Sequence, residues 1–442
     1  MKRLNRLSRA RPGQARPHLP RAGDPPAAAV EREFTPGQMG ARGDAVFEAE
    51  TGPIYVPYGL PGERVKARIV GDRAESIEVL AASADRQTPA CQHFGRCGGC
   101  QLQHWREAAY LAWKRDQVVQ ALARRGLGGI EVSDIVPAWG AGRRRAALHA
   151  ARVRGKVQLG FIERGGARLT PIVQCPVLVP ELEAVVMKLA PLAELTLPQR
   201  GEITLQCLLT DAGVDVAIKG AGRAEAVQRA AFEKLNAAAR DLKLARLSVD
   251  GEPIVTLATP SLRMGLARVT PPPGAFLQAT AEGEAVLGRL VLEALAGAGR
   301  VIDLFSGIGT FALRVAEKAE VLAAESDAEM LAALKAAADG AGGALKQVTT
   351  LRRDLLRTPL ASLEMKKFDG AVIDPPRSGA RLQAEQIARA PVRKLAYVSC
   401  EPASFARDVK VLIEHGFTIT KLVPVDQFRW SPHIELVAAM ER

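Results

Sequence analysis

The last third of the chain alternates short apolar runs with segments of helical periodicity. We expect strands at the apolar runs, which are residues 301–305, 321–325, 370–374 and 395–398. Helices are expected between and after these runs, at residues 310–318, 328–338 and 403–415, and closing strands at 418–424 and 433–440. Because strands and helices alternate with short connections, the pattern predicts an α/β fold with a doubly wound, mainly parallel sheet.

The preceding part of the chain has a different pattern. Residues 1–32 are rich in Arg and Pro without periodicity, which predicts a disordered basic arm. Short β-prone runs broken by Gly and Pro fill residues 33–85 and predict a small OB-like β-barrel. Residues 86–270 mix strands and helices and predict a central α+β domain, so the doubly wound domain occupies residues 271–442.

Length and charge limit the class of protein. The 442 residues are too many for one core and indicate two or three domains. Apolar runs stay shorter than the roughly 18 residues of a membrane span, and the Arg-rich start is not a secretory signal, so we expect a cytoplasmic protein. The net charge of +12 favours a polyanionic partner, and residues 143–145 fit a basic RNA-binding strand.

Cysteines form a compact set at Cys91, Cys97 and Cys100, with intervening glycines that allow the backbone to turn tightly. Six cysteines in a cytosolic chain of this length favour a metal or catalysis over disulfides. A fourth thiolate is required, and Cys175 is a better candidate than Cys207. Four thiolates hold either zinc or an iron-sulfur cluster, and one distant fourth ligand favours a structural 4Fe-4S cluster.

A glycine-rich turn follows the first strand of the doubly wound region. Gly307 and Gly309 allow a tight turn and close approach of a ligand to the backbone. Glu325, at the end of the next strand, can accept hydrogen bonds from two ribose hydroxyls. Residues 307–312 also fit the dinucleotide fingerprint, so an NAD site is an alternative. Asp303 precedes the glycines, which is more typical of methyl-donor enzymes.

Two other strand ends carry reactive side chains. Asp374 precedes two prolines that stiffen the following loop, and Cys400 follows the apolar run 395–398. In open α/β sheets, ligands and chemistry gather at the carboxyl ends of the strands. Both residues therefore fit a site at that edge, although Cys400 alone could also be a buried core thiol.

The stretch from Ser399 to Asp408 resembles the nucleophile motif of the RNA uracil-5-methyltransferase family. The resemblance covers nearly the whole chain. Residues 34–84 are similar to the family's TRAM domain, and Cys91, Cys97, Cys100 and Cys175 match its four iron-sulfur ligands. Further matching motifs are Phe276 to Gln278, residues 303–310, residues 374–379, and His433 to Glu435.

The resemblance implies a Rossmann-like methyltransferase domain that transfers a methyl group from S-adenosylmethionine to carbon 5 of uridine in RNA. It implies Cys400 as the nucleophile at carbon 6, Asp374 as the residue that holds the uracil edge, and Glu435 as the base at carbon 5. The implied donor-binding residues are Gln278, Asp303, Phe305, Gly307, Gly309, Glu325 and Asp374. The TRAM-like barrel and the cluster favour 23S ribosomal RNA over transfer RNA.

Two residues depart from the family pattern. Glu401 stands where Asn is usual, and its carboxylate disfavours the thiolate of Cys400. Thr280 stands where the donor-contacting motif usually has Asn. Two other functions stay open: methylation of an exocyclic amine through Asp374 and its prolines, and a catalytically inactive RNA-binding protein. The sequence contains no sign of an obligate dimer, so we expect a monomer.

Overall fold

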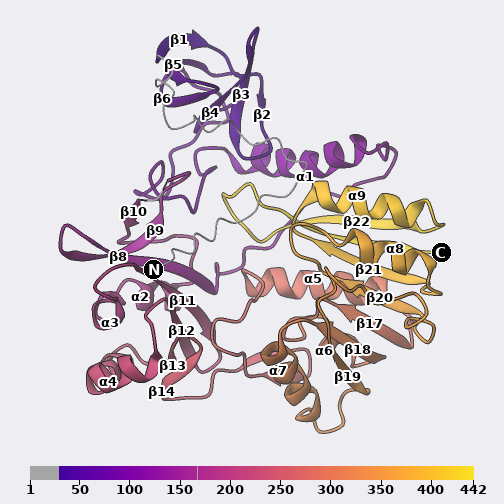
Figure 1. The fold of residues 1–442 in the computed structure, drawn as a ribbon. Helices are drawn as coiled ribbons and strands as arrows, with labels where there is room; N and C mark the ends of the chain where they lie inside the picture. Colours follow the sequence, from indigo (N-terminus) through magenta and orange to yellow (C-terminus); the bar gives the residue numbers. More distant parts are fainter. Residues whose placement is uncertain (1–28, 167) are drawn as a thin grey trace, which may run out of the picture. The chain divides into compact units, whose positions relative to one another are not determined.

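The computed structural model describes residues 29–166 and 168–442, and Figure 1 shows the elements. The chain divides into two compact units, one made of residues 44–83 with the described residues before Ala41, the other of residues 41–43 and 84–442. Most of the predicted arm, residues 1–28, lies outside the described residues. Residues 30–32, which the sequence also assigned to the arm, instead lie in a strand.

The first unit is one six-stranded sheet with the order β1-β5-β6-β4-β3-β2. Its strands are β1 (Val30–Phe34), β2 (Gln38–Met39), β3 (Asp44–Ala49), β4 (Gly52–Pro57), β5 (Arg64–Val70) and β6 (Arg73–Ala81). Along β5, buried apolar residues alternate with the exposed Arg64, Lys66 and Arg68, as the strand period of two requires. β1 and β2 stand at the two ends of the order, so the closed barrel stays a prediction.

The second unit starts with the cysteine-rich loop and helix α1 (Glu107–Ala123). A seven-stranded sheet follows, with the order β10-β9-β8-β11-β12-β13-β14. These strands are β8 (Arg145–Val153), β9 (Lys156–Ile162), β10 (Leu169–Pro171), β11 (Glu202–Thr210), β12 (Gly213–Lys219), β13 (Leu244–Val249) and β14 (Glu252–Thr256). Helices α2 (Pro180–Val186), α3 (Ala190–Thr196) and α4 (Ala224–Asp241) share its core, and a short hairpin of β15 (Leu262–Met264) and β16 (Ala267–Val269) follows.

The last third forms an eight-stranded sheet with the order β19-β18-β17-β20-β21-β23-β22-β7. Five strands are parallel: β17 (Arg300–Leu304), β18 (Glu320–Glu325), β19 (Val348–Arg352), β20 (Gly370–Ile373) and β21 (Lys394–Ser399). β23 (Glu435–Glu441) is antiparallel to β21 and to β22 (Thr418–Asp426), and β7 (Val136–Pro137) pairs with β22 at the edge. The expected strands and their order along the chain are confirmed, as is a mixed α/β fold.

Helices cover both faces of this sheet because successive residues of each strand point to opposite sides. On β20, Ala371 and Ile373 enter one core, while Val372 enters the other. The first core contains residues of α1, α8 (Arg381–Arg389) and α9 (Pro402–Ile413), and the second contains residues of α5 (Ala281–Ala294) and α6 (Ala312–Val315). Helix α7 (Ala328–Asp339) follows β18 (Figure 1). Among the described residues, the helices are too short or too polar to cross a membrane.

Candidate active site

The site lies where the winding of the sheet reverses direction. β17 pairs with β18 on one side and with β20 on the other, so the carboxyl ends of β17 and β20 form a topological switch point. Asp303 is in β17, Asp374 directly follows β20, and Cys400 directly follows β21. Glu435 begins β23, whose next residue pairs with Ser399, so the antiparallel register brings Glu435 beside Cys400.

The turn after β17 leaves room for a ligand beside its backbone. Phe305 has a φ of 66°, an uncommon conformation for a residue with a side chain, and its amide donates to the carbonyl of Ala324. The amide of Gly307 donates to the Glu325 carboxylate at 3.2 Å. A Cβ atom at Gly309 would come within 2.9 Å of Leu313 and of Leu334, whereas one at Gly307 would point into open space. Gly309 therefore permits close packing, and Gly307 borders room for a ligand.

The carboxyl group of Asp303 is buried and can bind a ligand that carries positive charge or donates hydrogen bonds. The residue is 1% exposed, and among the described residues neither carboxylate oxygen has a hydrogen-bond partner. Burial, and after it the nearby Asp374, raises the pKa of Asp303 well above its ordinary value, although the amide of Ala312 opposes the shift. A ligand that donates hydrogen bonds or carries positive charge, as S-adenosylmethionine does, would satisfy this group.

The predicted reactive side chains come together. Burial, then the charges of Glu435 and Asp374, raises the pKa of the half-buried Cys400 thiol to about 12, and Arg377 opposes them. Burial raises the pKa of Asp374 to about 7. Burial and the charge of Asp374 raise the pKa of Glu435 well above its ordinary value. A thiol and two carboxyl groups whose charges change one another's pKa values form a centre for nucleophilic and acid–base chemistry.

Glu401 caps the helix that follows Cys400. Its side chain accepts a hydrogen bond from the amide of Ala403 at 3.4 Å at the start of α9, and its charge contributes to the raised pKa of Cys400. The departure from Asn thus keeps the capping function, since the Glu401 side chain occupies the capping position where Asn is a preferred residue.

Gln278 is buried near the site and is held by a residue that the sequence analysis did not identify. Its side-chain oxygen accepts a hydrogen bond from Nε2 of Gln427 at 2.6 Å. Gln427 is remote in sequence and matches no motif, so only the fold brings it here. Thr280, in place of the usual Asn, caps α5 by accepting from the amide of Gly283 and donates to the carbonyl of Ala138.

The basic run at residues 143–145 has three different environments. Arg144 forms ion pairs with the buried Glu284 and is itself mostly buried, so it holds α5 rather than offering charge to RNA. Arg143 lies 5.7 Å from the ring of Phe428, and Arg145 lies 4.5 Å from the ring of Phe276. Arg144 is therefore committed to a structural ion pair, while RNA binding by Arg143 and Arg145 stays a prediction.

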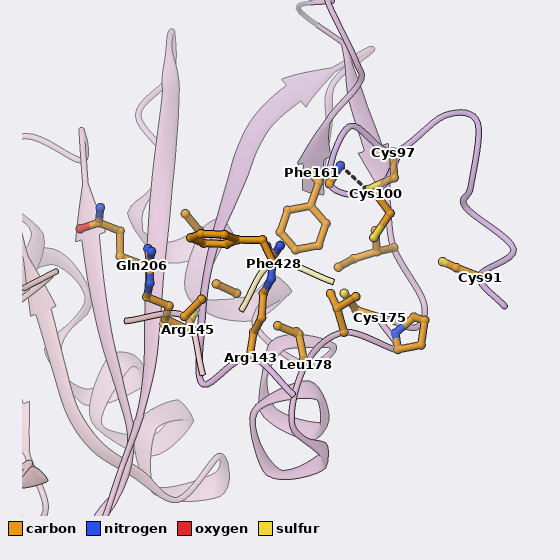
Figure 2. A pocket seen from close by; sticks show the side chains of 18 of the residues that line it. Cys91, Cys97, Cys100, Arg143, Arg145, Phe161, Cys175, Leu178, Gln206 and Phe428 are labelled. Carbon is orange, nitrogen blue, oxygen red and sulfur yellow. Dashed lines mark hydrogen bonds between the residues drawn. The ribbon is translucent and has the colours of Figure 1, made fainter. Parts of the chain in front are cut away.

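The four predicted cluster cysteines line one cavity of about 440 Å³. Figure 2 shows Cys91, Cys97, Cys100 and Cys175 toward one end of this cavity and Gln206 toward the other. Cys100 and Cys175 are buried, and Gly98 allows the loop to approach β9, because a Cβ there would lie 2.7 Å from the carbonyl of Ile162. Within residues 29–166 and 168–442, no three His, Cys, Asp or Glu side chains are grouped to hold a metal ion.

The thiols of two predicted ligands, Cys100 and Cys175, are protonated in the structure as it stands. Burial raises the pKa of the Cys100 thiol to about 11 and that of Cys175 to about 12, and Arg143 opposes both shifts. Cys207 is fully buried in β11. The cluster and its ligands remain a prediction.

The switch-point site, the glycine turn and the acidic residues at the ends of β17 and β18 define an α/β methyltransferase that uses S-adenosylmethionine. Residues 272–442 match the family described as tRNA (Uracil-5-)-methyltransferase. An uncharacterized RNA methyltransferase of Brucella suis is 43% identical over 410 residues, covering 93% of this chain and 98% of its own. The 23S rRNA (uracil(1939)-C(5))-methyltransferase RlmD of Halomonas elongata is 33% identical, covering 88% of this chain and 84% of its own.

Among solved structures, the chain resembles the tRNA (uracil-54, C5)-methyltransferase of Pyrococcus abyssi in complex with S-adenosyl-L-homocysteine. The TM-score is 0.71 at 20% identity, with 92% of this chain and 100% of that chain covered, which supports the fold. The chain belongs to the RNA uracil-5-methyltransferase family, and it is an S-adenosylmethionine-dependent RNA methyltransferase.

Proposed function

We propose that the enzyme methylates carbon 5 of a uridine in RNA through a covalent adduct with Cys400. The observation that carries this proposal is the convergence of Cys400, Asp374 and Glu435 at the strand ends. A donor-binding turn alone would suit many methyl acceptors. A cysteine flanked by carboxyls suits a carbon acceptor that must first be activated.

Each residue has one step in this mechanism. The thiol of Cys400 loses its proton to water, its Sγ atom adds to carbon 6 of uracil, and the electron pair of the ring double bond moves toward the carbonyl at carbon 4. Carbon 5 then takes the methyl group that S-adenosylmethionine supplies. Glu435 removes the proton from carbon 5, and the bond between Sγ and carbon 6 breaks as the ring double bond returns. Asp374 holds the uracil edge by hydrogen bonding.

The donor would be held by the turn between β17 and α6 and by residues around it. Glu325 would accept from the ribose hydroxyls, the backbone at Phe305, Gly307 and Gly309 would line the donor, and Gln278 would contact it. Asp303 and Asp374 would face its polar groups. The unpartnered carboxylate of Asp303 and the open space at Gly307 support this placement.

We infer 23S ribosomal RNA as the substrate, in the cytoplasm and with the enzyme as a monomer. The similarity to the Halomonas elongata 23S rRNA enzyme supports this choice. Transfer RNA is the alternative, because the Pyrococcus abyssi enzyme acts on tRNA. A uridine within folded RNA would have to be flipped out of its stack to reach Cys400.

Residues Cys91, Cys97, Cys100 and Cys175 would hold a 4Fe-4S cluster, and residues 34–84 would form a TRAM domain that binds RNA. Four protein ligands leave no iron open to substrate, so the cluster's role would be structural. Iron and sulfide analysis after anaerobic purification tests the ligand set. Cys175→Ala is expected to lose the iron, while the matched control Cys207→Ala retains it.

The reaction is tested with 5-fluorouridine-substituted RNA and labelled S-adenosylmethionine. Fluorine at carbon 5 cannot leave as a proton, so the reaction stalls with the RNA bonded to Cys400. We expect a labelled, denaturant-resistant adduct with the wild type and with Cys207→Ala, and none with Cys400→Ala. Sequencing the trapped RNA from pools of ribosomal and transfer RNA identifies the target.

The other outcomes separate the alternatives. Methylation that survives Cys400→Ala without an adduct would reject carbon-5 chemistry in favour of an exocyclic amine. RNA binding without methylation of any pool would favour an inactive binding protein.

A further inference from the structure

The loop between β22 and β23, residues 427–434, is held firmly from two sides. Asp426, just before it, accepts hydrogen bonds from Lys114 at 2.6 Å and from Tyr110 at 2.5 Å, and all three side chains are buried. The carbonyl of Trp430 accepts from the amides of Gln101 and Leu102, which follow Cys100. The β22–β23 loop therefore has a fixed position between α1 and the cysteine-rich loop.

Gln427, the first residue of this loop, reaches from it into the active site. Its side chain is 1% exposed. Its Oε1 atom accepts from the amide of Ala279 at 2.7 Å, which fixes which end of the amide is oxygen. Its Nε2 atom donates to Oε1 of Gln278 at 2.6 Å, and the amide lies near enough to Glu435 to lower the pKa of that carboxyl. The amide of Gln427 thus contacts Gln278, a proposed donor-binding residue, and lies near Glu435, the proposed base.

We propose that Gln427 is a positioning residue for methyl transfer, whose buried amide holds Gln278 toward the methyl donor and lies beside Glu435, the proposed base. The proposal rests on the proposed function, since it assigns Gln427 a role in that reaction. It adds a residue that no sequence motif identified.

The donor and acceptor groups of the two amides support this role. An amide NH2 group has two donors, and Gln427 uses one of them on Gln278, which leaves the other for the nearby Glu435. Because Oε1 of Gln278 accepts from Gln427, the amide is oriented with its NH2 group free to donate to an acceptor group of a ligand. Gln427 therefore determines which face of Gln278 meets the donor.

The fold makes room for this side chain. A Cβ atom at Gly283, in the first turn of α5, would come within 2.8 Å of the Cβ of Gln427. Thr280 is committed to capping the same helix. Thr280 stands where the family usually has Asn, and it is Gln427, from the β22–β23 loop, that hydrogen-bonds Gln278.

The effect of Gln427 on the pKa of Glu435 has a definite direction. A hydrogen bond donated to a carboxylate favours its charged form, so the Gln427 amide holds the pKa of Glu435 lower than burial and Asp374 alone would set it. Arg145 and Arg377 act in the same direction, and the Cys400 thiol faces the same carboxyl. Removing the amide leaves those groups in place, so any change in pH dependence reports on Gln427.

The test compares Gln427→Met with Gln383→Met in the full-length protein. Met keeps the length of the side chain and removes both hydrogen-bonding groups. Gln383 is an equally buried glutamine of α8 that bonds the backbone of Leu360 in both directions, away from the site. It therefore controls for the cost of removing any buried amide. Binding of S-adenosylhomocysteine by calorimetry, the pH profile of kcat and the thermal midpoint are measured for each variant.

We expect Gln427→Met to weaken S-adenosylhomocysteine binding about tenfold, the effect of removing one hydrogen bond that orients a ligand-binding side chain. We also expect the acid limb of its kcat profile to move to higher pH, because the pKa of Glu435 is then higher. Gln383→Met is expected to lower the thermal midpoint while leaving binding and the pH profile of the wild type.

A Gln427→Met protein that loses only thermal stability, with unchanged binding and an unchanged pH limb, would reduce Gln427 to a packing residue. Failure of the proposed function has a different signature. A wild type that methylates no RNA would refute that function and the Glu435 part of the proposal together, while the binding measurement still reports the Gln278 part.

Discussion

Burial of the Asp303 carboxyl group costs stability in the free protein. Its pKa is raised well above the ordinary value by burial, so the folded state holds a proton that the unfolded chain releases. The resulting cost is absent below the unfolded pKa and grows as pH rises toward the folded pKa. Asp303→Asn removes it, so we expect the thermal midpoint of the free protein to rise by about 2 °C at neutral pH, and more at pH 8.5 than at pH 6.

The same substitution should abolish tight binding of S-adenosylhomocysteine, because an amide replaces the carboxylate that meets the donor. Thermal unfolding at several pH values and calorimetry test the two effects together. A midpoint that falls equally at every pH would show that burial of this charge is not the controlling factor.

Glu401 sets how readily Cys400 reacts. Its carboxylate is one of three that raise the pKa of the thiol, while its capping of α9 can be taken over by Asn. We expect Glu401→Asn to react faster with iodoacetamide at pH 8, by a few-fold, with an unchanged thermal midpoint. Glu401→Gln is the control for removing charge with a poorer cap. An alkylation rate that does not change in either variant would remove Glu401 from the electrostatics of the site.

The pH dependence of methylation follows from the carboxyls beside the thiol. Burial raises the pKa of Asp374 to about 7, and burial with Asp374 raises that of Glu435, so both hold protons in mildly acidic solution. As pH increases, Glu435 becomes available as the base for the carbon-5 proton, and a larger fraction of Cys400 is thiolate. Single-turnover methylation should therefore rise between pH 6 and pH 8, and a rate that is flat across this range would contradict the assigned roles.

At the scale of elements, α1 holds the loop that carries Gln427. Lys114 is fully buried against Asp426, so Lys114→Met leaves a buried carboxylate with fewer partners. We expect a loss of about 3 kcal/mol in the free energy of unfolding and a lower kcat, because the β22–β23 loop loses its anchor. Denaturant unfolding and turnover measure both. The double variant Lys114→Met with Asp426→Asn should recover stability, since no unpaired charge remains.

The elements show what sequence patterns can and cannot predict. Long apolar runs such as 395–398 and periodic segments such as 328–338 match β21 and α7 closely, because burial on one or two faces dictates the pattern. Helix α1 falls within residues 86–270, which the sequence assigns to the central domain, yet Val118 and Leu122 pack in a core shared with the C-terminal sheet. Its periodicity indicates a buried face but does not identify the partner.

The same limit applies to the site. Asp303, Asp374 and Cys400 could be predicted because each follows or ends a strand whose direction fixes one sheet edge. Gln427 could not, since its proposed role depends on hydrogen bonds with Gln278 and Ala279 that only folding creates. Nor could the pairing of Arg144 with Glu284, which lies 140 residues away.

For the whole molecule, the first unit is expected to supply RNA affinity without influencing donor binding. Its strand β5 exposes Arg64, Lys66 and Arg68 on one face, while the active site is built entirely from the second unit. Each phosphate contact releases counterions, so RNA binding weakens as salt increases, with a slope that counts the contacts. Replacing these three residues by Gln should weaken RNA binding at least tenfold.

The salt slope should also decrease by about 1 for every phosphate that the variant no longer neutralises, and S-adenosylhomocysteine binding should stay unchanged. A charge-matched control replaces Arg289, Lys335 and Arg381 by Gln, three exposed residues on helices of the second unit that pair with acidic residues of their own helix. Equal weakening in both triple variants would mean that only net charge attracts RNA. Weakening confined to the β5 variant would assign RNA binding to the first unit, because the control variant removes the same number of positive charges from the second unit.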